Sequence, residues 1–132
     1  MTGLATRTLG QAVDVIAPDG CEVRILAATD RGSMAHFTLG PGEVARAVAH
    51  RTVEEVWYFL SGHGQMWRSL GQADEIVAVV PGVSLAIPQG TRFQLRNDGA
   101  EPLAAVAVTM PPWPGEDEAY FVDGPWPAGV GD

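Results

Sequence analysis

The chain has 132 residues, the size of one domain, and carries a formal net charge of −8 at pH 7. This acidity argues against nucleic acid and against anionic membrane surfaces as partners, since both attract basic residues. No run approaches the ~20 apolar residues of a membrane helix, and the first residues lack a secretory signal. Cys21 is the only cysteine, so an internal disulfide is impossible, and we expect a cytoplasmic protein.

Short apolar runs, separated by Gly, Pro, Asp and Asn, recur along the chain. They lie at residues 12–17, 22–27, 34–39, 55–60, 75–80, 91–96 and 103–110. Many short strands at this spacing are typical of an all-β sandwich or barrel, and no segment has a helical period. A double-sheet jelly roll is the natural member of that class, so we expect a single barrel domain over residues 1–110.

Residues 111–132 have a different composition. Prolines and glycines in this segment argue against regular structure, and it holds five acids and no basic residue. Its aromatic residues are too apolar for a free tail; they are Trp113, Tyr120, Phe121 and Trp126. We therefore expect an extended strap that packs on the same domain, with a lid over the mouth of the barrel as the alternative.

Two segments, residues 50–62 and 81–97, carry the most informative spacing. In the first, Glu55 and Gly62 are separated by six residues, and His50 precedes them. The second contains Gly82, Pro88, Gly90 and Asn97. In spacing and residue type these segments resemble the two signature motifs of the cupin superfamily. The resemblance implies a small double-stranded β-helix, or jelly-roll barrel, that often holds a metal ion.

The standard metal site of that family is incomplete here. Val48 and Phe93 stand at positions where the resemblance implies histidines, so only His50 and Glu55 map onto ligands. A third ligand is available if His36 faces inward, which would give a set of two histidines and one carboxylate. Such a set suits one divalent transition metal ion, for example Zn, Mn, Ni or Fe. The alternative for His36 is a partly exposed or hydrogen-bonded strand histidine.

Alternation along each strand predicts which other side chains line the interior. An inward Glu55 brings Trp57 and Phe59 with it, and an inward Phe93 brings Thr91 and Leu95. After Gly62 the alternation leaves two options, because Met66 and Arg68 share one face and Trp67 lies on the other. An inward Arg68 would bind a carboxylate or phosphate, and an inward Trp67 would stack on a ring. The predicted pocket residues are Val48, Trp57, Phe59, Met66, Trp67, Arg68, Phe93 and Leu95.

Three functions remain open at this stage. The leading hypothesis is a small-molecule pocket built on His50 and Glu55, with metal-free isomerisation or proton transfer on a small metabolite. The second is a metal-dependent oxygenase or isomerase that uses His36, His50 and Glu55. The third is a non-catalytic ligand-binding or sensory protein with the same pocket. The resemblance also implies a homodimer, because such barrels usually pair sheet to sheet.

Overall fold

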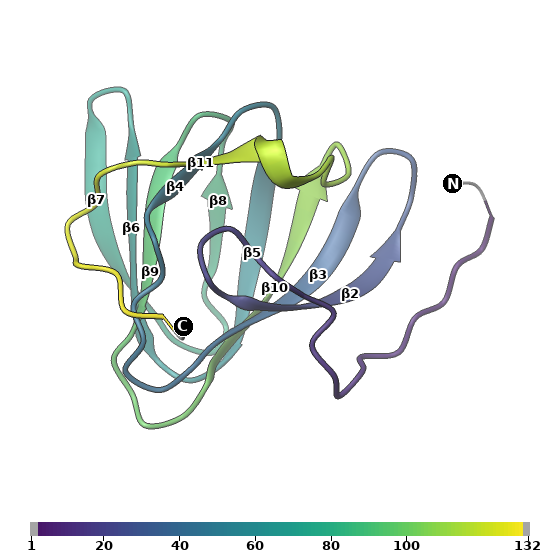
Figure 1. Cartoon of the computed structure of the whole chain (residues 1–132), viewed down its shortest axis with the longest axis horizontal. Coiled ribbons are helices and arrows are strands. Elements are labelled where there is room, and N and C mark those ends of the chain that lie inside the picture. The colour runs from purple at the N-terminus through teal and green to yellow at the C-terminus, as the bar shows by residue number, and fades with distance from the viewer. Residues whose placement is uncertain (1–2, 131–132) are drawn as a thin grey trace.

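The computed structural model describes residues 3–130 and consists of two antiparallel sheets (Figure 1). The first sheet contains, in spatial order, β1 (Val15–Ile16), β2 (Glu22–Ala28), β3 (Ser33–Leu39), β10 (Leu103–Met110), β5 (Glu54–Ser61) and β8 (Ser84–Ile87). The second contains β11 (Ala119–Phe121), β4 (Val48–His50), β9 (Arg92–Asn97), β6 (Gly64–Leu70) and β7 (Ala73–Val79). The predicted all-β jelly roll is confirmed. Within the described residues no helix is long and apolar enough to span a bilayer.

Strand alternation and one tight turn explain how the motif segment folds locally. Along β5, Glu55, Trp57 and Phe59 are buried while the residues between them are exposed. Gly62 then turns the chain into β6 with a φ of 80°, a conformation that costs glycine little. A Cβ at Gly62 would also lie 2.6 Å from the carbonyl oxygen of Pro102. The motif glycine is therefore required by the turn that places β5 and β6 in opposite sheets.

The core lies between the two sheets and takes side chains from both. It includes Leu39, Val48, Trp57, Phe59, Met66, Ile87, Phe93, Leu95 and Leu103. Each such side chain stabilises the fold by roughly 1.5–3 kcal/mol when it is removed from water. Most of the predicted pocket residues are therefore packed against one another as core.

The C-terminal segment joins the two sheets. After β10 it crosses one end of the barrel through the 3₁₀ turn η1 (Glu116–Glu118), and β11 then pairs with β4 at the edge of the second sheet (Figure 1). Further on, the backbone N–H and C=O of Gly129 both pair with Val44. The expectation that residues 111–132 have no regular structure was wrong. The proline-free stretch between Pro114 and Pro125 forms η1 and β11.

Candidate functional site

His50 and Glu55 lie at the end of the barrel that the C-terminal segment crosses. His50 is the last residue of β4 in the second sheet, and Glu55 lies near the start of β5 in the first. Their side chains face each other across the interior, with 3.9 Å between Nδ1 of His50 and Oε1 of Glu55. Both residues are buried, at 6% and 4% exposure. The structure thus brings the two motif residues together, but the separation is too long for a hydrogen bond.

The Glu55 carboxylate is held by two donors. Nε1 of Trp57 donates to Oε1 at 3.0 Å, and Oγ1 of Thr109 donates to Oε2 at 2.6 Å. Thr109 stands opposite Glu55 in the pairing of β10 with β5. Each carboxylate oxygen therefore already accepts one hydrogen bond, and the group is fixed in place. Strand alternation along 103–110 could have placed Thr109 on the inward face, but its position opposite Glu55 depends on the register of β10 with β5.

The His50 imidazole has no comparable partner. Its ring lies edge-on to Phe93 at 5.2 Å between centroids and edge-on to Trp113 at 5.1 Å. Its Nδ1 atom is buried without a hydrogen bond. A buried polar atom left unpaired costs about 1–3 kcal/mol, so a binding partner at this atom would recover free energy. The sequence predicts Trp113 as part of the strap but contains no signal that links it to His50.

The C-terminal segment is anchored beside this site. The Glu118 carboxylate accepts hydrogen bonds from the backbone N–H of Thr52 at 2.6 Å, from its hydroxyl at 2.6 Å and from the N–H of Val53 at 2.9 Å. Burial tends to raise the pKa of Glu118, but these hydrogen bonds and nearby His50 outweigh it and hold the pKa below its usual value. The N–H of Trp113 donates to Oγ of Ser33. The segment is thus anchored to the barrel, and its Trp113 lies against the ring of His50.

The open alternative between Arg68 and Trp67 is resolved by the pairing of β6 with β9. Arg68 stands directly opposite the buried Phe93, and opposed residues of paired strands share one face. The Arg68 side chain therefore lies on the inward face of the sheet. It donates to the carbonyl oxygen of Ala86 at 2.8 Å. Trp67 faces the other way and donates from Nε1 to Asp74 at 3.1 Å. Trp67 is therefore not a wall of the interior.

The predicted metal set is not assembled. On β3 it is Phe37 that faces inward, stacking on Trp57 at 5.0 Å, so His36 faces out of the barrel. His36 lies beside Arg24 in an outer hollow of about 580 Å³. Burial, followed by the Arg24 charge, lowers the pKa of His36. The whole sheet therefore separates His36 from His50 and Glu55, and the expectation of a three-ligand site is corrected.

The remaining residues do not fit the metal ion that the family resemblance implies. Val48 and Phe93, at the other ligand positions, carry no donor atoms, and both oxygens of Glu55 are engaged. Within residues 3–130 no three His, Cys, Asp or Glu side chains are arranged to hold a metal. These described residues therefore do not form a metal-binding site.

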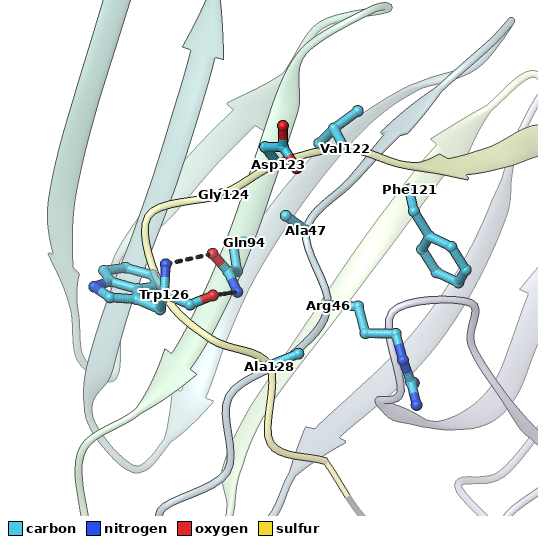
Figure 2. A pocket seen from close by; sticks show the side chains of 9 residues that line it. All are labelled: Arg46, Ala47, Gln94, Phe121, Val122, Asp123, Gly124, Trp126 and Ala128. Carbon is cyan, nitrogen blue, oxygen red and sulfur yellow. Dashed lines mark hydrogen bonds between the residues drawn. The ribbon is translucent and has the colours of Figure 1, made fainter.

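A second hollow, of about 370 Å³, lies on the outer face of the second sheet beneath the C-terminal segment (Figure 2). On its floor Gln94 donates to the carbonyl oxygen of Trp126 and accepts from its N–H. The Arg46 side chain and the Phe121 ring border it on the side away from Trp126 (Figure 2). Because the Gln94 amide binds the backbone of Trp126, we interpret this hollow as part of the site where the C-terminal segment attaches to the second sheet.

Cys21 belongs to the core and has no reactive character. It is fully buried, and burial raises the pKa of its thiol well above the usual value. Its N–H donates to the carboxylate of Asp19 at 3.0 Å. Burial also raises the pKa of Asp19. A thiol kept protonated in the core is a poor nucleophile.

Comparison with known proteins agrees with this architecture. The family model described as "Cupin domain" matches residues 35–109. A Bacillus halodurans protein of known structure shares 22% identity at a TM-score of 0.65, over 70% of this chain and 72% of its own. A Klebsiella pneumoniae protein with a double-stranded β-helix domain shares 17% identity at a TM-score of 0.63, over 82% and 89%.

Oxalate decarboxylase from Bacillus subtilis is 19% identical at a TM-score of 0.69, over 85% of this chain but 30% of its own. These identities establish a shared fold and do not extend to activity. No match was found among curated proteins. The family model spans more than half of the chain, and the two-sheet barrel agrees with it: this protein belongs to the cupin family.

Proposed function

We propose that this cupin binds a small organic molecule at the strap-covered end of its barrel, with His50 as a direct contact. The observation that carries the proposal is the buried Nδ1 of His50, which lacks a hydrogen-bond partner while the facing Glu55 is held by Trp57 and Thr109. Phe93 and Trp113 supply apolar surface around the imidazole. A mostly apolar site with few polar groups is typical of small-molecule binding.

The tight packing limits how a ligand enters. Trp57 and Phe93 are 3% and 2% exposed and belong to the core, so neither offers room without unfolding the barrel. Trp113 is half-buried and lies outside the strands, in the strap. Displacement of Trp113 is therefore the least costly route to His50, and the ligand is expected to be small.

The arrangement allows proton transfer as well as binding. An imidazole can give or take a proton near neutral pH, and the fixed carboxylate of Glu55 lies 3.9 Å from it. Isomerisation or proton transfer on a small metabolite is thus the reaction class that this pair supports. A non-catalytic cupin would use the same contacts, so turnover of an identified ligand by the native protein and by Glu55→Gln separates the two.

The experiment is a ligand-observed NMR screen of pooled small metabolites against the native protein. His50→Ala is the test variant, and His63→Ala is the matched control because His63 is exposed. We expect binders whose affinity falls at least about ten-fold in His50→Ala, equivalent to ~1.4 kcal/mol, and is unchanged in His63→Ala. Binding that survives His50→Ala would show that the site lies elsewhere.

We also propose that two copies of the chain form a homodimer through the outward face of the first sheet. The outward face of this sheet exposes the apolar side chains of Met34, Val56, Tyr58 and Leu60. Exposed apolar patches of this kind commonly mark protein contacts. Light scattering coupled to size exclusion should give twice the chain mass for the native protein and the chain mass for Tyr58→Arg. A native monomer at micromolar concentration would contradict the proposal.

A further inference from the structure

Unpaired polar atoms are concentrated at the His50 end of the barrel. In the described part of the chain, four buried side-chain atoms lack a hydrogen-bond partner: Nδ1 of His36, Nδ1 of His50, Nε of Arg68 and Oγ1 of Thr91. His36 belongs to the outer hollow. The other three residues lie on or beside strands of the second sheet, so their grouping needs a common explanation.

Strand register places these three residues around one ring, that of Phe93. Arg68 stands directly opposite Phe93 in the pairing of β6 with β9. Thr91 precedes Phe93 by two residues, about 6.6 Å along the chain, and has the same inward orientation. Val48 pairs with Phe93 in β4 and β9, so the next inward position of β4, His50, falls opposite Thr91. The imidazole of His50 also touches the Phe93 ring.

All three unpaired atoms can donate a hydrogen bond. Nε of Arg68 is always a donor, the hydroxyl of Thr91 can donate, and Nδ1 of His50 donates when it carries a proton. A single water accepts two hydrogen bonds, whereas a carboxylate accepts about four. Glu55 does not meet this need, because its Oε1 lies 3.9 Å from Nδ1 of His50, too far for a hydrogen bond, and neither Nε of Arg68 nor Oγ1 of Thr91 has a partner. Three donors without an acceptor therefore favour an anionic oxygen ligand over a lone water.

We propose that the ligand is a small organic acid whose carboxylate is bound by His50, Thr91 and Arg68. This inference rests on the proposed function and adds the substrate class and two recognition residues. Arg68 is held in position by the carbonyl oxygen of Ala86 and by Glu75, and its buried Nε has no partner. The apolar part of the acid would lie against Phe93 and Trp113.

Four tryptophans provide a direct test by NMR of their indole N–H groups. Trp57 and Trp113 border the site, whereas Trp67 and Trp126 lie on the outer face of the second sheet, where both meet Gln94. The probes are acetate and benzoate, each compared with its neutral amide. We expect the acids to shift the Trp57 and Trp113 signals, to leave the other two unmoved, and to bind at least about ten-fold more tightly than the amides.

Two conservative variants isolate the recognition residues. Thr91→Val keeps the side-chain shape and removes the hydroxyl, and Arg68→Lys keeps the charge and removes Nε. Each should weaken acid binding about ten-fold while amide binding stays constant. Arg92→Lys is the matched control, because Arg92 is exposed on the neighbouring strand position.

The possible failures are distinguishable. If the acids leave all four indoles unmoved, or move only Trp67 and Trp126, the carboxylate site is wrong. Equal binding of acids and amides also overturns carboxylate recognition. In either case His50-dependent binders from the metabolite screen would still support the proposed function, and their absence would remove both.

Discussion

The two ends of this barrel treat a buried polar motif residue in opposite ways. At one end the amide of Asn97 donates to the carbonyl oxygens of Leu39, Gly40 and Glu101 and accepts from the N–H of Gly99. At the other end Nδ1 of His50 has no partner. A polar group saturated by backbone stabilises the fold, whereas one left unpaired costs stability, and such costs are commonly found at functional sites. The comparison indicates a structural role for Asn97 and supports the ligand contact proposed for His50.

The largest effect is expected at the saturated end. Asn97→Leu removes four hydrogen bonds, three to backbone carbonyl oxygens and one from the Gly99 N–H. We expect the free energy of unfolding to fall by about 3 kcal/mol or more. Urea unfolding followed by tryptophan fluorescence measures it. A loss below about 1 kcal/mol would show that Asn97 is not the structural residue that its contacts indicate.

The next effect concerns the strap. Glu118→Gln replaces a carboxylate that accepts three hydrogen bonds from Thr52 and Val53, and we expect a loss of about 2 kcal/mol at pH 7. Because the pKa of Glu118 is lowered in the folded protein, its contribution is present above the unfolded value of 4.5. It is lost as pH falls through the folded pKa. Native and variant stabilities should therefore converge in acid, and a constant gap between them would exclude this linkage.

A smaller change of opposite sign is expected at Asp19. Burial raises its pKa, so the charged form is disfavoured in the folded state and native stability decreases as pH rises from the unfolded value of 3.8 through the raised folded value. Asp19→Asn removes this cost and keeps an acceptor for the Cys21 N–H. We expect the variant to be more stable by about 1 kcal/mol at pH 7, with the gain vanishing in acid. Thermal unfolding at pH 3 and pH 7 tests the sign.

The smallest effect is expected at His50 itself. His50→Phe removes an unpaired polar atom and keeps a planar ring between Phe93 and Trp113. The free energy of unfolding should change by less than about 1 kcal/mol, while ligand binding is lost. If the variant is instead destabilised as strongly as Asn97→Leu, His50 is a structural residue and the contrast between the two ends disappears.

Local patterns predicted those parts of the structure that depend on neighbours in sequence. Alternation around Glu55 correctly placed Trp57 and Phe59 inside, because a regular strand has a strict period of two. The same rule could not choose between Arg68 and Trp67, since a bulge near a glycine reverses the parity. The orientation of His36 could not be predicted either. It depends on the pairing of β3 with β2 and β10, which places the neighbouring Phe37 on the inward face and His36 on the outward face.

Contacts between distant segments were beyond the reach of the sequence. Thr109 meets Glu55 because β10 pairs with β5 in one particular register, and no local feature specifies that register. Trp113 meets His50 only because the strap folds back over the barrel end. The motif spacing therefore predicted two residues of the candidate site, His50 and Glu55. The contact of Thr109 with Glu55 and that of Trp113 with His50 depended on tertiary structure.

The strap also protects one edge of the second sheet. β11 pairs with β4, so the backbone groups on that side of β4 are not left open. Glu118 and Trp113 hold the segment around β11 against Thr52 and His50. A chain cut after Met110 would therefore expose both His50 and the backbone edge of β4, and it should associate with other copies through that edge.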